Sequence, residues 1–288
     1  MREGLEKGEV KQMKSYLERI EDEWEKKETL LCFGMDPVIE RMKIDTSKDL
    51  SDEIVAYFSK ILHEISGKIS AVKPNVACYL QYGTKGLSAL VELINRAKTK
   101  KLPVIIDAKV GDIGRTSKAY AKYIFEVLKG DAVTLNPYMG YDSLEPFFTW
   151  KDKGFYVLAL TSNDGAHHFQ YEKLGSGKPF YEYVIHSLCS WNKKHNSIGA
   201  VIGATQEEFK GCVEKMVNMK CIIPLLIPGV GAQGGSYSEI EKILENVKYN
   251  KGIARINASS SISYAHERFP SSTFEEASYL AVEEILKG

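Results

Sequence analysis

The sequence lacks an excess of charge of either sign, a long apolar run and a leader-like N-terminus. Its 38 basic and 38 acidic residues cancel, so no net field attracts the protein to nucleic acid or to an anionic membrane. The longest strongly apolar stretch, 221–230, is short and is interrupted by Pro224 and Pro228, which argues against a membrane span. We therefore expect a cytoplasmic protein that binds neither nucleic acid nor membranes and holds any anionic ligand locally.

The sequence also lacks any paired cysteine motif. No CxxC or CxxxC spacing occurs among its five cysteines, although such spacings mark many zinc sites. Scattered cysteines in a cytoplasmic protein are usually reduced thiols. We therefore expect no bound metal and no disulfide bond. The cysteines are Cys32, Cys78, Cys189, Cys212 and Cys221.

The first 30 residues have the pattern of an amphipathic helix. Residues 5–30 are rich in Glu and Lys, and apolar residues recur there at three- and four-residue spacing. We expect residues 1–29 to form a helix that caps the protein, and residues 30–288 to form one catalytic domain. The apolar positions are Val10, Met13, Leu17, Ile20 and Trp24.

After this helix, short apolar runs rich in β-branched residues alternate with longer helical patterns. This alternation is typical of parallel strands joined by crossover helices. Eight such units favour an α/β fold of the (β/α)8 TIM-barrel type with an extra N-terminal helix; an open doubly wound sheet has the same local units and is the alternative. Several runs end on polar residues, where barrels assemble their active sites. The runs are 30–36, 69–75, 103–109, 132–138, 155–162, 198–205, 222–229 and 253–259.

The densest group of ionisable residues lies in DAKVGDIGRT, residues 107–116, at the end of the third run. Side chains alternate along a strand, so Asp107 and Lys109 point to the same side. Opposite charges this close keep each other ionised, and Asp112 adds a carboxylate at the next turn. Lys73, at the end of the preceding run, supplies a second amine. For a D-x-K pair alone, an ordinary ion pair closing the barrel end is the structural alternative.

A glycine-rich segment, PGVGAQGG at 228–235, follows the seventh run. It matches GxGxxG, but the dinucleotide-binding form of that motif opens the first βα unit and is followed about 20 residues later by an acid. Residues 249–254 contain no acid. In a barrel, a loop at this position binds phosphate through backbone N–H groups, and Gln233 can add a side-chain donor. A flexible loop without a ligand is the alternative.

These segments resemble the orotidine 5'-phosphate decarboxylase family. DAKVGDIGRT is similar to the family signature D-x-K-x-x-D-I-x-x-T, and the resemblance extends over nearly the whole chain after the N-terminal helix. It implies a dimeric (β/α)8 barrel with two sites at the subunit interface, which converts orotidine 5'-monophosphate (OMP) to UMP without a cofactor or a metal. The other matching segments are FGMDP at 33–37, VKPN at 72–75, LTSNDGA at 160–166, PGVGAQGG at 228–235 and NASSSISYA at 257–265.

The resemblance also implies roles for individual residues. Lys109 would protonate the carbanion at C6 of the pyrimidine, and Lys73 and Asp107 would complete the charged array with Asp112 of the partner subunit. The implied substrate-binding residues are Asp36 and Thr116 at the ribose, Thr116 again from the partner, Asn75 in VKPN, Ile113 as an apolar wall near the base, Ser162 at the pyrimidine, and Gly229, Gly231 and Gln233 at the phosphate.

One position departs from the family pattern. The eighth strand of the family usually ends in G-R-x-I or S-R-x-I, with the arginine on the phosphate, whereas residues 259–262 read Ser-Ser-Ser-Ile. Ser260 therefore occupies the arginine position, and we expect a weakened grip on the phosphate. Arg255 does not replace it, because its odd spacing from Ser260 places it on the other face of the strand.

Two other functions fit part of the pattern. A sugar-phosphate decarboxylase or aldol synthase of the same barrel group has a similar array but uses its aspartates to bind magnesium. Lys73, Ser162 and Gln233 favour the nucleotide enzyme over this alternative. The serine at position 260 also allows a catalytically weak nucleotide-binding protein, which an assay of CO2 release would distinguish from an enzyme.

Overall fold

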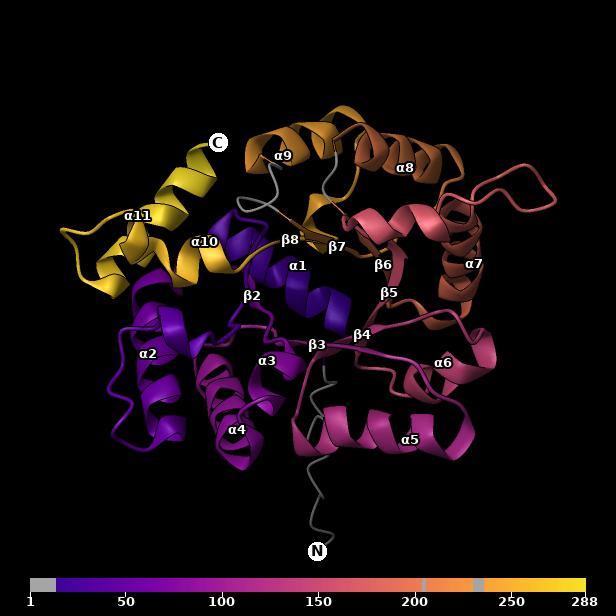
Figure 1. Cartoon of the computed structure of the whole chain (residues 1–288). Helices are drawn as coiled ribbons and strands as arrows, with labels where there is room; N and C mark the ends of the chain where they lie inside the picture. The colour runs from indigo at the N-terminus through magenta and orange to yellow at the C-terminus, as the bar shows by residue number, and fades with distance from the viewer. Residues whose placement is uncertain (1–13, 204–205, 230–235) are drawn as a thin grey trace, which may run out of the picture.

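The computed structural model describes residues 14–203, 206–229 and 236–288. Its eight parallel strands form one ring in the order β2-β1-β8-β7-β6-β5-β4-β3 (Figure 1). Parallel bridges from Val72 to Val104 and from Asn75 to Asp107 join β2 to β3 and close the ring. The predicted barrel is confirmed, and the open-sheet alternative is wrong. The strands are β1 (Leu31–Phe33), β2 (Ala71–Val72), β3 (Ile105–Val110), β4 (Ala132–Leu135), β5 (Gly154–Leu160), β6 (Ile198–Ile202), β7 (Leu225–Pro228) and β8 (Ala254–Ala258).

Helical segments follow every strand and surround the ring (Figure 1). The α-helices are α1 (Tyr16–Lys27), α2 (Leu50–Ile65), α3 (Val76–Leu80), α4 (Gly83–Thr99), α5 (Gly114–Lys122), α6 (Tyr141–Phe148), α7 (Phe180–His195), α8 (Gln206–Asn218), α9 (Tyr237–Asn246), α10 (Ser260–Ser263) and α11 (Phe274–Lys287). Shorter 3₁₀ or π segments are η1 (Ile39–Arg41), η2 (Tyr123–Val127), η3 (Asp164–His168), η4 (Lys251–Ile253) and η5 (Ala265–Glu267).

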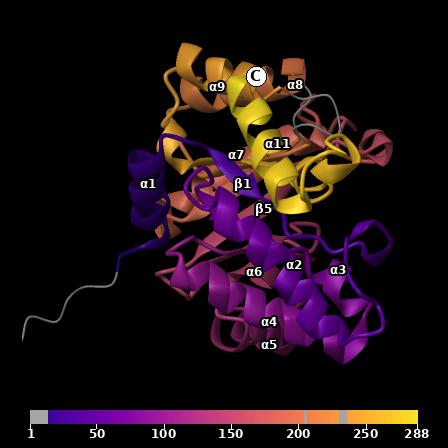
Figure 2. The same ribbon diagram turned by 90° about the vertical axis from the view of Figure 1, so that its left-hand side faces the viewer.

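The N-terminal helix α1 covers one end of the ring. Its start is fixed by a capping box, in which Ser15 and Glu18 each bond the other's backbone N–H. Arg19 forms an ion pair of 2.7 Å with Asp131, just before β4, and Lys27 donates to the carbonyl of Ile69, just before β2. Figures 1 and 2 show α1 over the centre of the ring in one view and at the outer edge in the other. The predicted amphipathic helix is thus present over 16–27, and Val10 and Met13 lie outside the described residues.

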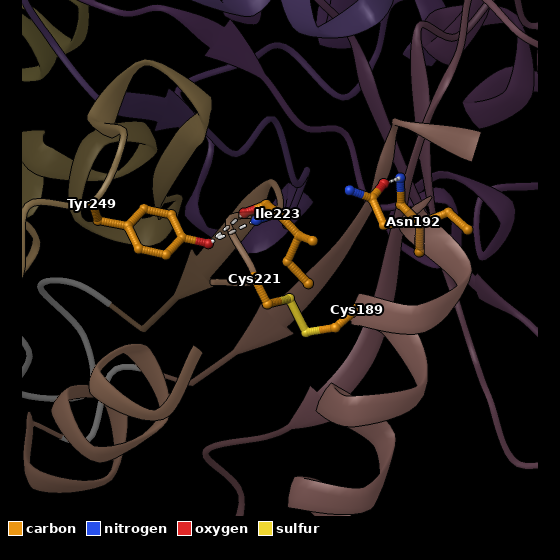
Figure 3. The surroundings of a disulfide bond; sticks show 6 residues. Cys189, Asn192, Cys221, Ile223 and Tyr249 are labelled. Atoms are coloured by element: carbon orange, nitrogen blue, oxygen red, sulfur yellow. Dashed lines mark hydrogen bonds between the residues drawn. A yellow bond between two sulfur atoms is a disulfide. The ribbon is translucent and has the colours of Figure 1, made fainter. Parts of the chain in front are cut away.

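The prediction that all five cysteines are reduced is wrong for two of them. Cys189 on α7 and Cys221, in the segment that leads into β7, form a disulfide with 5.7 Å between their Cα atoms (Figure 3). The pair is 32 residues apart in sequence, so no local spacing could show it; the fold brings the two segments together. Closing a loop of that length stabilises the fold by about 3–4 kcal/mol in the chain-entropy account.

No helix in the described ranges is long and apolar enough to cross a membrane. Within the same ranges, no group of three or more His, Cys, Asp or Glu side chains lies close enough together to hold a metal ion.

Candidate active site

Two lysines and one aspartate meet where β2 and β3 end. Asp107 Oδ2 lies 2.8 Å from Lys73 Nζ, and Asp107 Oδ1 lies 2.6 Å from Lys109 Nζ. Asp107 and Lys73 are buried, at 6% and 4% exposure, whereas the Lys109 side chain is 49% exposed. The carboxylate therefore bridges two ammonium groups, of which only that of Lys109 is open to a reactant. The sequence predicted all three residues and their meeting point.

The electrostatics keep the buried pair ionised. Burial alone would raise the pKa of Asp107, but the positive charges of Lys73 and Lys109 outweigh it and hold that pKa well below its usual range. Burial alone would lower the pKa of Lys73, but the carboxylates of Asp107 and Asp36 outweigh it and raise that pKa above its usual value. Lys73 and Asp107 are therefore both charged at neutral pH.

Asp36 and Asn75 extend the site along β1 and β2. Asp36 Oδ1 accepts the backbone N–H of Asn75 at 2.9 Å, and the amide of Asn75 reaches Asp107 Oδ2 at 3.5 Å. Asp36 Oδ2 accepts the hydroxyl of Ser259, which directly follows β8, at 2.7 Å. The sequence reasoning missed Ser259, although its place directly after an apolar run was the available signal.

The end of β3 is irregular at the lysine. Its pairing with β4 shifts between Ile106 and Val110, and Lys109 has a φ of 46°, a left-handed conformation that residues with a Cβ rarely adopt. The buried hydroxyl of Thr134 on β4 bonds to this segment. Thr134 is a second residue that the sequence reasoning did not single out.

Asp112, Ile113 and Thr116 lie further along, at the start of α5. Ile113 is 59% exposed, and its N–H donates to Asp112 Oδ1 at 2.8 Å. Among the described residues no ion pair joins Asp112 to a lysine of the same chain. Within one chain, Asp112 is thus not ion-paired with the lysines of the Lys73–Asp107–Lys109 array.

The remaining predicted residues follow other strands at the same end of the barrel. Ser162 comes after β5 and lies against Gly203, which comes after β6. Gly229 follows β7 with a φ of 101°, a conformation that favours glycine, and Ser260 is the first residue of α10 after β8. Gly231 and Gln233 lie outside the described residues.

Arg255 bonds to other partners, in agreement with the prediction that it does not replace the family arginine. Its side chain is fully buried and donates to the carbonyls of Gly252 and Ala254, before and at the start of β8. It also donates to the carbonyl of Ile20 on α1. The guanidinium therefore links the N-terminal helix to the start of β8 and is not available to bind a ligand at the opposite end of the barrel.

Comparison with known proteins shows the family to which this sequence is similar. The sequence profile of the orotidine 5'-phosphate decarboxylase / HUMPS family matches residues 29–269. The chain belongs to this family. The orotidine 5'-phosphate decarboxylase of Thermomicrobium roseum is 40% identical over 228 residues, which are 77% of each chain. That of Dehalococcoides mccartyi strain BAV1 is 39% identical over 257 residues, 87% of this chain and 89% of its own.

Solved structures of family members have the same fold. An OMP decarboxylase of Leishmania donovani superposes with a TM-score of 0.73 at 28% identity, over 95% of this chain and 98% of that one. The family match and the closed ring of strands agree on a barrel. In this chain the charged array lies at the carboxyl ends of β2 and β3.

Proposed function

We propose that this protein decarboxylates orotidine 5'-monophosphate to UMP. The single observation that carries the proposal is the Lys73–Asp107–Lys109 array at the mouth of the barrel, in a chain of the decarboxylase family. Breaking the bond between C6 and the carboxylate releases CO2 and leaves an electron pair on C6. A fixed positive charge beside C6 lowers the energy of that carbanion.

Lys109 has the position for both parts of this chemistry. Its ammonium is the exposed member of the array, held by Asp107 at 2.6 Å. It first stabilises the developing charge and then transfers a proton to C6, acting as a general acid. No electron-accepting cofactor is needed, because the electron pair ends in the new C–H bond.

Asp107 contributes through its charge. Burial raises the pKa of Asp107, but the two lysines lower it by more, so the net pKa is well below its usual range. Asp107 is therefore anionic when the substrate carboxylate arrives. Two such anions about 4 Å apart repel by about 4 kcal/mol at an effective dielectric of about 20. That repulsion disappears as CO2 leaves, which adds to the driving force for bond cleavage.

We assign the other predicted residues to parts of the nucleotide. Asp36 binds the ribose with Thr116 of the partner, and Asn75 supports Asp36 through its N–H. Ser162 contacts the pyrimidine, with Ile113 as an apolar wall. The phosphate lies beyond β7 and β8, the end of a barrel where phosphate sites are common; its residues are Gly229, Gly231, Gln233 and the neighbouring Ser260.

We further propose a homodimer in which Asp112 and Thr116 complete the partner's site. Among the described residues, Asp112 has no ion pair with a lysine of its own chain, and this supports the assignment. Large apolar side chains are also exposed near this end of the barrel, as expected of a surface that another subunit covers. They are Leu80 at 53%, Ile113 at 59%, Tyr120 at 42%, Tyr138 at 82% and Met139 at 42% exposure.

The cytoplasmic location and the division into a capping segment, 1–29, and a catalytic domain, 30–288, stay predictions. The Cys189–Cys221 disulfide weighs against the first, because cytoplasmic proteins seldom have structural disulfides. The contacts of α1 with the starts of β2 and β4 support a capping role for the helix within the segment 1–29.

The function is tested by the loss of OMP absorbance with purified protein after exhaustive dialysis against EDTA. We expect full activity, because Lys109 supplies the positive charge that a metal would otherwise provide. Release of CO2 in step with the absorbance change excludes a protein that only binds the nucleotide. Activity that is lost in EDTA and returns with magnesium would instead favour the sugar-phosphate alternative.

The shared site is tested by mixing two inactive variants. Lys109→Ala and Asp112→Ala homodimers should each be nearly inactive. After subunit exchange, each heterodimer has one site with both lesions and one site with none, so a 1:1 mixture at equilibrium should recover about a quarter of wild-type activity. Exchange is verified with differently tagged subunits, and no recovery despite exchange places Asp112 in the site of its own chain or outside catalysis.

A further inference from the structure

Thr134 lies on β4 opposite the irregular end of β3, and it is buried at 2% exposure. Regular pairing of the two strands stops after Ile106, which lies opposite Val133. It resumes at Val110, which lies opposite Leu135. Three residues of β3, 107–109, therefore stand opposite the single residue Thr134. A bulge of this kind removes backbone groups from the regular ladder of hydrogen bonds and re-aims the side chains within it.

The Thr134 hydroxyl meets the hydrogen-bonding groups that the bulge leaves without a strand partner. Its Oγ1 accepts the N–H of Ala108 at 3.0 Å and the N–H of Lys109 at 2.9 Å. The same hydroxyl donates its proton to Asp107 Oδ1 at 2.9 Å. A hydroxyl has one proton and two lone pairs, so these three bonds use its full capacity and fix its orientation.

These bonds act on the two groups that direct the Lys109 side chain. The N–H bond holds the Lys109 backbone at a φ of 46°, which is unfavourable for a residue with a Cβ and therefore needs support. The bond to Asp107 Oδ1 fixes the same oxygen atom that receives the Lys109 ammonium at 2.6 Å. Thr134 thus controls both ends of the lysine, its backbone and the acceptor of its amine.

We propose that Thr134 is a positioning residue for the decarboxylation, whose hydroxyl aims the Lys109 ammonium through the backbone of Lys109 and through Asp107. The inference rests on the proposed role of Lys109. Thr134 itself is buried at 2% exposure, so we expect it to make no contact with the nucleotide. Because an error of about 1 Å in the placement of a reacting group costs about a hundredfold in rate, a small shift of the ammonium is sufficient for a large effect.

The test replaces Thr134 by valine, which keeps the shape of the side chain and removes the hydroxyl. We expect kcat to fall about 10- to 100-fold through misplacement of the ammonium. The KM for OMP and the Kd for UMP should change less than about threefold, because the contacts that the nucleotide makes equally in the ground and transition states are unchanged. Thr134→Ser should restore kcat to within about fivefold of wild type, since the hydroxyl returns with somewhat greater freedom.

Thr29→Val is the matched control. Thr29 is also buried at 2% exposure, and its Oγ1 also accepts a strand N–H, that of Leu31 at 3.1 Å. It lies before β1, at the opposite end of the barrel from the array. The stability losses of the two valine variants are compared by thermal unfolding. We expect the control to keep kcat within about twofold of wild type. Loss of a buried hydroxyl alone then does not explain a fall in kcat.

Three results would overturn the proposal. The first is a folded Thr134→Val protein with wild-type kcat, and the second is a Kd for UMP that weakens in step with kcat. If the valine variant does not fold, Thr134→Cys and Thr134→Ser decide instead. The thiol is a weaker hydrogen-bonding group, so the cysteine variant must have the lower kcat, and equal values are the third contrary result.

The outcome is separable from a failure of the proposed function. Activity that survives the loss of the Lys109 amine contradicts the role of the lysine itself. If the Lys109 variant is inactive and Thr134→Val is fully active, the proposed function still holds and only the positioning role of Thr134 is contradicted.

Discussion

Replacing Lys109 by methionine should lower kcat/KM for OMP by about 10⁴-fold or more, since the change removes both a charge at the carbanion and a general acid. Methionine keeps much of the length and apolar volume of the lysine stem. The buried Asp107 carboxylate keeps its ion pair of 2.8 Å with Lys73 after the change, so we expect the protein to remain folded. The measurements are steady-state kinetics, thermal unfolding and UMP affinity on the same preparation.

The expected pattern is a loss of rate without a loss of binding. UMP has no carboxylate at C6 and carries no developing charge, so its affinity should change far less than kcat. Lys242→Met, on the exposed face of α9, is the control for removing a lysine elsewhere and should be fully active. A Lys109→Met protein that retains more than about a tenth of wild-type kcat would be incompatible with a lysine that both stabilises and protonates the carbanion.

The eight strands could be predicted from the sequence because each has a local pattern, whereas the closure of the ring, which an open sheet lacks, is shown by the structure. Each of the eight apolar runs rich in β-branched residues overlaps one observed strand, although β3 extends one residue beyond its run and β5 begins one residue before its run. Polar residues at or near the ends of these runs, among them Asp36, Lys73 and Asp107, gather at one end, because parallel strands of a barrel all finish on the same side. The charged array follows from these two facts, and its distances only sharpen the prediction.

What the sequence could not show depends on contacts across the fold. The Thr134 hydroxyl acts through a bulge in the neighbouring strand, and a register shift has no signature in a single run of residues. Ser259 meets Asp36 across two strands that are distant in sequence. The Cys189–Cys221 bond likewise joins segments that only the packing of α7 against the barrel brings together. The places that we propose for Asp112 and Thr116 depend on a second chain.

Ser260→Arg should tighten UMP binding by about ten- to a hundredfold, because one charge-assisted contact contributes about 1.5–3 kcal/mol. The serine offers a neutral hydroxyl, whereas arginine offers a bidentate, charged donor pair to phosphate. Ser260 directly follows Ser259 at the end of β8, and β8 pairs with β7, which ends beside Gly229. Arg255 does not compensate, because its guanidinium is buried at the opposite end of the strand.

The gain should depend on the phosphate of the ligand. UMP should improve strongly and uridine hardly at all, because the nucleoside lacks the group that the guanidinium would meet. With OMP, the improvement in kcat/KM should appear mainly in KM, provided that the contact is equal in the ground and transition states. Ser271→Arg, in the exposed segment before α11, adds the same charge elsewhere and should leave UMP affinity unchanged. An unchanged UMP affinity in a folded Ser260→Arg protein would mean that position 260 does not face the phosphate.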